Sequence, residues 1–216
     1  MSCIDVQGLS KRFNRRTIFK EVSFKVSIGE VFAVTGRNGS GKSTLVKILA
    51  GLLGPTKGDI AYTHGNNPLE SQHLYRHLGL VAPYLRLYEE FSARENLKFF
   101  CSIRGIPFDV SAMNELLERL NLPTDRNDPI AAYSSGMMQR MRFAFALLHD
   151  PAFLLLDEPT SNLDDDGKST VYDIVRESRE SRCIMIATND AEDFALCDKH
   201  YSVDGTVPMF VQSEAG

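Results

Sequence analysis

The sequence predicts an α/β fold in which an N-terminal antiparallel β subdomain precedes a mostly parallel β-sheet, itself interrupted by an inserted helical subdomain. Three observations lead to this prediction. Apolar runs at residues 31–34, 152–156 and 184–187 are typical of strands buried on both faces. Residues 84–150 carry apolar side chains at three-to-four spacing, which indicates helices. Residues 22–26 alternate between apolar and polar side chains, as a half-buried strand does.

The first quarter of the chain predicts two short strands, a buried strand and a helix. Residues 4–6 and 22–26 are the half-buried strands, and a basic turn at residues 12–16 separates them. The buried strand at residues 31–34 runs into a glycine-rich loop. A helix is expected over residues 43–53, because apolar residues recur at helical spacing and glycine and proline follow.

The rest of the chain divides into a helical segment and a strand–helix–strand unit. Three helices are predicted in the insert, at residues 95–103, 110–120 and 137–148. After the insert, the strands at residues 152–156 and 184–187 enclose a crossover helix at residues 165–178. We therefore expect one domain over residues 1–216, with residues 84–150 inserted into it as a helical subdomain.

Composition narrows the class of protein. The chain has 216 residues, with 24 Lys and Arg against 28 Asp and Glu, so its net charge of -4 gives no reason to expect a nucleic-acid partner. The four cysteines show no C-x-x-C pairing, which favours free thiols in a reducing cytoplasm. The first residues do not resemble a signal peptide, and no apolar run approaches the roughly 20 residues of a membrane helix. We expect a soluble protein whose membrane role, if it has one, depends on a partner.

A phosphate-binding loop is the clearest motif. Its eight residues fit G-x-x-x-x-G-K-[ST] between a predicted strand and a predicted helix, and Thr44 follows directly: Gly36, Arg37, Asn38, Gly39, Ser40, Gly41, Lys42 and Ser43. Backbone N–H groups of such a loop surround phosphate oxygens, and the helix N-terminus adds positive potential. We expect Lys42 to bind the β- and γ-phosphates and Ser43 to bind Mg²⁺. A chance glycine-rich turn is the alternative.

Two carboxylates follow a predicted buried strand. Asp157 is the expected Mg²⁺ partner, and Glu158 could polarise a water that attacks the terminal phosphate. Acidic residues also end strands merely to face solvent, so this is the alternative reading. The phosphate loop favours the functional reading, because the ends of adjacent parallel strands meet at one edge of the sheet.

A serine-rich helix start lies upstream of these carboxylates. Ser134, Ser135 and Gly136 precede the helix predicted at residues 137–148, and serine is a favoured helix N-cap. Such a helix start can bind an anion. By itself, the segment favours an ordinary capped core helix. Its place between a helical insert and an acidic strand end, in a phosphate-loop protein, favours a functional role.

Together these motifs resemble the nucleotide-binding domain of ABC-type ATPases, and the resemblance covers nearly the whole chain. Ser134, Ser135 and Gly136 are similar to the Leu-Ser-Gly-Gly-Gln signature, with a serine for its first glycine. The segment ending in Asp164 is similar to the family's D-loop. Phe13 stands where the family's adenine-stacking aromatic lies, although a core residue at a strand end is an equal alternative. No Asn-Lys-x-Asp motif for guanine occurs, so ATP is the expected nucleotide.

The resemblance implies a mode of action. It implies a P-loop NTPase core that works as a head-to-tail pair, with each ATP and Mg²⁺ held between one chain's phosphate loop and the other chain's signature helix. It also implies that the helical insert contacts an integral-membrane permease at the cytoplasmic face of the cell membrane. Short chains of this type resemble exporter subunits, including those of the haem-exporter-like group. The second ATPase subunit could be identical or different.

Two positions depart from the family pattern. Pro83 stands where a glutamine near the metal and the attacking water is usual, and Asn189 stands where a histidine contacts the γ-phosphate. Asparagine can donate a hydrogen bond but cannot become cationic. We therefore hypothesise slow hydrolysis when the chain pairs with itself. The alternative is a subgroup that tolerates both replacements because Glu158 persists.

Rival functions remain open at this level. A soluble ABC ATPase without a transporter is the main rival, and a slow-hydrolysing nucleotide-binding switch subunit of a heterodimer is the other. The basic cluster Lys11, Arg12, Arg15 and Arg16 is interpreted as a solvated turn, with nucleotide phosphates or membrane lipid as its alternative partners.

Overall fold

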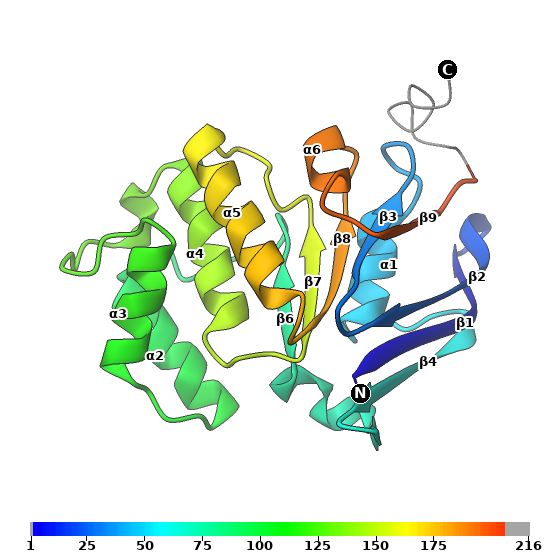
Figure 1. Cartoon of the computed structure of the whole chain (residues 1–216), viewed down its shortest axis with the longest axis horizontal. Coiled ribbons are helices and arrows are strands. Elements are labelled where there is room, and N and C mark those ends of the chain that lie inside the picture. Colours follow the sequence, from blue (N-terminus) through cyan, green and yellow to red (C-terminus); the bar gives the residue numbers. More distant parts are fainter. Residues whose placement is uncertain (1, 206–216) are drawn as a thin grey trace.

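The computed structural model describes residues 2–205 and shows two sheets with helices on both sides of the larger one (Figure 1). The strands are β1 Cys3–Phe13, β2 Arg16–Ser27, β3 Val31–Thr35, β4 Lys57–His64, β5 Asn67–Leu69, β6 Leu78–Val81, β7 Phe153–Asp157, β8 Cys183–Ala187 and β9 Lys199–Ser202. The helices are α1 Lys42–Leu49, α2 Ala93–Arg104, α3 Val110–Arg119, α4 Ser135–Leu147, α5 Asp165–Ser178 and α6 Ala191–Phe194, with 3-10 turns at Ser71–Arg76 and Ile130–Ala132.

The larger sheet has the order β6-β7-β8-β3-β9, and all its pairings are parallel. Its central strands β3, β7 and β8 are buried at every position, as their continuous apolar sequences predict. The carboxyl ends of β3 and β7 therefore lie at one edge of the sheet. This edge carries both the phosphate loop and the strand-end carboxylates.

Strand β7 contributes to two hydrophobic cores, because successive side chains of a strand point to opposite faces. Phe153 and Leu155 pack with α1 and the antiparallel strands β1 and β2. Leu154 and Leu156 pack with α4 and α5 on the other face. The parallel sheet thus separates the two cores while contributing side chains to both.

The smaller sheet is antiparallel and has the order β2-β1-β4-β5. Strand β1 pairs with β2 and with β4, and its pairing with β2 shifts register at Leu9, Lys11 and Arg12. Figure 1 shows β1, β2 and β4 at the opposite end of the molecule from α2 and α3. The α/β fold expected from the sequence is confirmed, with its parallel and antiparallel parts.

Three helices, α2, α3 and α4, follow β6 and precede β7 in the chain. Local sequence fixes where they start. Ser92 and Glu95 form a reciprocal capping box at the start of α2, and Asp109 caps α3 through the N–H groups of Ser111 and Ala112. Helix α4 packs against β6 and connects this helical segment to the parallel sheet.

Some boundaries differ from the expectations. Helix α1 ends at Leu49 rather than at residue 53, because Gly51 adopts a left-handed conformation with φ of 73°. The sequence reading assigned no strand to β4, β5, β6 or β9. Residue 1 and residues 206–216, part of the predicted single domain, lie outside the described residues. Within residues 2–205, no helix has the length and apolar character needed to cross a bilayer.

Candidate nucleotide-binding site

The predicted phosphate loop connects the end of β3 to the start of α1. Gly41 precedes α1 in a left-handed conformation with φ of 111°, and a Cβ there would lie 2.5 Å from Cγ2 of Ile18. A Cβ at Gly36 would lie 2.6 Å from Oγ of Ser40. Both positions thus require glycine, for close packing as well as for backbone conformation. The loop is tightly wound, as a phosphate-binding loop requires.

A cavity of about 420 Å³ opens above this loop. It is lined by Arg16, Ile18, Asn38, Gly39, Gly41, Lys42, Ser43, Thr44 and Glu158. Most of the predicted phosphate-binding residues therefore share one cavity with the predicted catalytic carboxylate. Strand β2 adds Ile18, for which the sequence predicted no role, and Arg16, which belongs to the basic cluster interpreted as a solvated turn with nucleotide phosphates or membrane lipid as alternative partners.

Lys42 points back into the loop. Its side chain is only 5% exposed, and Nζ donates to the carbonyl oxygens of Gly36, at 2.8 Å, and Arg37, at 3.4 Å. Burial lowers the pKa of Lys42, while the nearby carboxylates of Glu158 and Asp157 oppose this shift. The ammonium group is thus held by carbonyl groups at the place where a phosphate would approach.

Asp157 is the last residue of β7 and is 0% exposed. Neither of its buried carboxylate oxygens has a hydrogen-bond partner among the described residues. Burial raises the pKa of Asp157, while the hydroxyl of Ser43 and the ammonium of Lys42 act in the opposite direction. An unpartnered buried carboxylate beside a serine hydroxyl fits a divalent cation that is shared with phosphate oxygens.

The described residues form no all-protein metal cage that would compete with this interpretation. Among residues 2–205, no group of three or more His, Cys, Asp or Glu side chains could hold a metal ion. A cation at Asp157 and Ser43 would therefore take its other ligands from phosphate and water, as Mg²⁺ commonly does.

Glu158 is exposed and adopts a left-handed backbone conformation with φ of 51°. Its N–H donates to the carbonyl of Ala187 at 2.8 Å, which fixes the turn after β7 to the end of β8. Strain of this kind is held by surrounding structure and is common at functional sites. The turn directs Glu158 toward the cavity, whereas Asp157 stays inside the sheet.

A second cavity, of about 390 Å³, adjoins the first. Its lining comprises Asn38, Glu158, Thr160, Ser161, Asn162, Thr188, Asn189, Asp190 and Asp193. Asn38 and Glu158 border both cavities. Nδ2 of Asn189 donates to Oδ1 of Asn38 at 2.7 Å. The position expected to hold a histidine is therefore close to the phosphate loop.

Asp193 is a site residue that the sequence reading missed. It is 1% exposed and accepts hydrogen bonds from the hydroxyls of Thr188, at 2.7 Å, and Thr160, at 2.9 Å. Burial raises its pKa, and these hydrogen bonds act in the opposite direction. The buried carboxylate connects the loops that follow β7 and β8. Its position in the acidic segment of residues 190–193 gave no specific signal.

The predicted signature and D-loop residues lie beside one another. Ser134 caps α4 by accepting from the N–H of Met137, and Asp164 caps α5 by accepting from the N–H of Gly167. A Cβ at Gly136 would lie 3.3 Å from the carbonyl oxygen of Asn162. Neither the signature residues nor Asp164 are among those that line the phosphate-loop cavity.

Gln139, one turn into α4, is a second missed residue. It is fully buried, and Nε2 donates to the carbonyl of Pro159 at 2.8 Å. Arg142 donates to its Oε1 at 2.8 Å. The amide thus connects the signature helix to the segment that follows Glu158. Glutamine at this position has no local pattern that would have revealed the contact.

Phe13, the predicted adenine-stacking residue, is 46% exposed at the end of β1, so the core-residue alternative is wrong. Nζ of Lys11 lies 4.8 Å from its ring centroid and donates to the carbonyl of Gly54 at 2.6 Å. Lys11 thus supports the exposed ring by a cation–π contact. Stacking on adenine stays a prediction.

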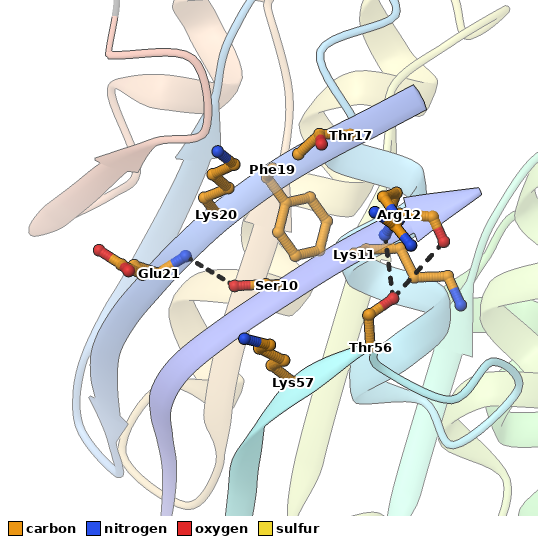
Figure 2. A pocket seen from close by; sticks show the side chains of 9 residues that line it. All are labelled: Ser10, Lys11, Arg12, Thr17, Phe19, Lys20, Glu21, Thr56 and Lys57. Atoms are coloured by element: carbon orange, nitrogen blue, oxygen red, sulfur yellow. Dashed lines mark hydrogen bonds between the residues drawn. The ribbon is translucent and has the colours of Figure 1, made fainter. Parts of the chain in front are cut away.

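Strands β1 and β2, with the start of β4, line a basic cleft of about 430 Å³. Figure 2 shows its lining: Ser10, Lys11, Arg12, Thr17, Phe19, Lys20, Glu21, Thr56 and Lys57. The N–H of Arg12 donates to Oγ1 of Thr56, which joins β1 to the start of β4. Residues of β2 alternate between the two cavities, since Ile18 lines the phosphate-loop cavity and Thr17 lines the cleft. The cleft is thus separate from the phosphate loop.

The fold and this site define a nucleotide-binding α/β protein. A sequence model of the family described as ABC transporter matches residues 19–161, which is more than half of the chain. The chain therefore belongs to the ABC transporter family, as an ATP-binding member.

Relatives with similar sequences belong to the same family. The chain is 33% identical over 201 residues to an uncharacterized ABC transporter ATP-binding protein, YdbJ, of Bacillus subtilis, covering 91% of this chain and 64% of YdbJ. It is 31% identical to Nod factor export ATP-binding protein I of Rhizobium etli, covering 95% of this chain and 66% of that protein. The chain thus spans less than two thirds of the length of these relatives. YybJ of Bacillus subtilis is 32% identical and is covered over 89% of its length.

Solved structures share the fold. An ATP-binding subunit of an ABC transporter superposes with a TM-score of 0.81 at 26% identity, covering 93% of this chain and 85% of that chain. A dimeric bacterial ABC transporter cassette superposes with a TM-score of 0.79 at 23% identity, over 93% of this chain and 94% of that one.

Proposed function

We propose that this chain is the ATP-hydrolysing, energy-coupling subunit of an ABC transporter, acting on a separate membrane permease at the cytoplasmic face. The observation that carries the proposal is the cavity in which Lys42, Ser43 and Glu158 meet, with Asp157 buried beside it. Family membership supports the nucleotide, because ABC ATPases bind and hydrolyse ATP.

The residues of this chain would divide the chemistry among them. On binding of ATP, Lys42 would exchange the carbonyls of Gly36 and Arg37 for phosphate oxygens, and loop N–H groups would hold the rest of the triphosphate. Ser43 and Asp157 would hold Mg²⁺, which neutralises phosphate charge when bound. Glu158 would accept a proton from, or orient, the attacking water.

A second ATPase subunit would complete the site. Ser134, Gly136 and Asp164 lie away from this chain's own phosphate-loop cavity, which supports their acting on a nucleotide bound by another chain. The similarity of fold to a dimeric cassette is consistent with such a pair.

An apolar groove of about 330 Å³ supports the permease partner. It is lined by Ala50, Leu52, Tyr75, Leu78, Leu80, Leu85, Arg86, Leu87, Phe100, Arg104, Arg142, Phe145 and Ala146. Beside it in the chain, the exposed rings of Tyr88, Phe91 and Phe99 contact one another. Exposed apolar surface of this kind is typical of a site for a protein partner. The groove lies where α2 and α4 meet β6, so a partner there would contact both parts of the fold.

A slow-hydrolysing switch is the second candidate function. It is favoured by the amide pair Asn189–Asn38, since an asparagine pair supplies no cation to the phosphate loop. Pro83 supports the same reading, because proline has no side-chain acceptor. A heterodimer in which the partner chain performs most turnover would then suit this subunit.

Two experiments test the proposal. Purified protein should bind a fluorescent ATP analogue with Mg²⁺, and Lys42→Met should weaken binding at least tenfold while the exposed Lys98→Met should not. Glu158→Gln should bind ATP normally but lose about 100-fold in turnover. Unchanged ATP binding by Lys42→Met would contradict the assignment of residues 36–43 as the loop that binds the ATP phosphates.

The permease partner is tested in membranes. A tagged chain extracted in mild detergent should co-purify with a multi-spanning protein. Leu52→Asp in the groove should abolish this association, whereas Val110→Asp, at another exposed apolar residue on α3 but outside the groove, should retain it. Recovery of the protein only in the soluble fraction would favour the non-transport ABC ATPase instead.

A further inference from the structure

Tyr84 is the third residue after the end of β6, the strand that neighbours β7. Strands β6 and β7 pair in register with Val81 opposite Leu156, which places Ala82 next to Asp157 at the carboxyl edge of the sheet. The N–H of Leu85 donates to the carbonyl of Ala82 at 3.1 Å, closing a turn with Pro83 and Tyr84 at its centre. Proline favours the first central position of such a turn. Pro83 therefore helps to set the direction of the Tyr84 side chain.

The ring of Tyr84 is held over helix α1. Nζ of Lys47 lies 4.1 Å from its ring centroid, a cation–π distance. Lys47 follows Ser43 by four residues, so the two side chains share one face of α1. This contact places the tyrosine over the helix face that carries the predicted metal ligand Ser43.

The hydroxyl of Tyr84 is buried and has no hydrogen-bond partner among the described residues. The same holds for both carboxylate oxygens of Asp157, so two unpartnered polar groups lie in one region. Burial, with a smaller contribution from the Asp157 carboxylate, raises the pKa of Tyr84, so the phenol keeps its proton. A buried hydroxyl of this kind is free to bond a water or a ligand that enters the site.

We propose that the Tyr84 hydroxyl is a positioning group of the ATP–Mg²⁺ site, donating a hydrogen bond to a water bound beside Asp157. The proposal rests on the proposed ATPase function. Pro83 replaces the glutamine that the family pattern leads us to expect at this position. The turn that contains Pro83 presents the side chain of Tyr84 instead. A neutral phenol can donate one hydrogen bond and accept others, which suits a water shared with a cation or a phosphate. Tyr84 would therefore act through that water and not as an acid or base.

Tyr84→Phe tests this assignment, because it removes one oxygen and keeps the ring over Lys47. The chain has no Trp, so binding of a fluorescent ATP analogue can be followed with little background. We expect the Mg²⁺ concentration for half-maximal binding to rise about fivefold, and kcat to fall about tenfold, as for a lost hydrogen bond. Binding without Mg²⁺ should not change. Tyr201→Phe, which removes the hydroxyl of a ring packed near Phe24, should match the wild type in all three.

A thermal melt completes the test. Removing a buried unpartnered hydroxyl should leave the Tm of Tyr84→Phe equal to or above that of the wild type. A wild-type Mg²⁺ requirement and wild-type kcat in Tyr84→Phe would overturn the proposal and leave Tyr84 as a packing residue. Failure of the wild-type protein to bind ATP with Mg²⁺ would overturn the proposed function itself.

Discussion

Asn189 and Asn38 are joined side chain to side chain, with 2.7 Å between Nδ2 of the former and Oδ1 of the latter. The contact connects the end of β8 to the phosphate loop, and both residues line the cavity that Glu158 shares with the loop. The side chain at residue 189 therefore lies beside the phosphate loop. An asparagine supplies an amide dipole there, and a histidine could supply a positive charge.

Asn189→His should raise ATP turnover by about tenfold, because an imidazolium stabilises developing phosphate charge better than an amide does. Steady-state phosphate release by the purified protein measures the effect. The variant Asn189→Gln, which lengthens the amide without adding charge, is the matched control and should gain little. An equal rate in wild type and Asn189→His would exclude Asn189 as the limiting feature of hydrolysis.

Phe13→Ala should weaken ATP binding by about tenfold, since stacking of a base on an aromatic ring is worth about 1–3 kcal/mol. Lys11→Met should have a smaller effect, about twofold, because it removes only the support behind the ring. Equilibrium titration with a fluorescent ATP analogue gives both values. Phe99→Ala, another exposed ring, controls for lost surface area and should bind ATP as the wild type does. Normal binding by Phe13→Ala would place adenine elsewhere.

Asp193→Ala should lower the free energy of unfolding by about 3 kcal/mol. The substitution leaves the buried hydroxyls of Thr160 and Thr188 without their acceptor. Urea unfolding at pH 7.5 measures the loss. The exposed Asp173→Ala, which removes only a surface pair with Arg176, should cost less than about 0.5 kcal/mol. Equal losses for both variants would contradict a linking role for Asp193.

Acid should destabilise the protein through His149 before most carboxylates titrate. Burial, with a contribution from Arg104, lowers the pKa of His149 to about 4, while the carbonyl of Leu78 acts in the opposite direction. The folded protein thus favours the neutral imidazole. The stability that the neutral imidazole contributes is fully present above pH ~6.5, the pKa of the unfolded state. This contribution is lost as the pH falls toward the folded-state pKa of about 4.

Between pH 7.5 and 5, this loss should amount to about 1–2 kcal/mol, allowing for partial exposure of the ring. Urea unfolding at the two pH values measures it. In His149→Gln the difference between the two pH values should shrink by the same amount. A pH dependence identical to that of the wild type would show that another group is responsible.

The sequence was most informative where a pattern repeats or a motif is local. Strands β3, β7 and β8 are apolar throughout, so their burial could be read from the sequence. Strand β9 is mostly polar and only partly buried, and β4 carries one buried residue, so neither shows a strong pattern. Their pairing depends on neighbours that are distant in sequence. The assignment of residues 84–150 as a subdomain stays a prediction.

The candidate site shows the same division. The phosphate loop and Asp157 could be found because their spacing is local to one turn or one strand end. Asp193, Gln139 and Tyr84 could not be found in this way. Each contacts a partner more than 15 residues away in the chain, or is oriented by a turn, and neither feature shows in the local sequence. Roles assigned to these residues in ATP chemistry remain predictions.

Strand β7 distributes its side chains between two cores, and this arrangement bears on how the molecule unfolds. No boundary lies along the strand at which one core could melt while the other stayed intact. Heating should therefore give a single calorimetric transition. A nucleotide bound at the end of β7 should raise the midpoint temperature of that transition by the same amount for the distant helices as for the phosphate loop.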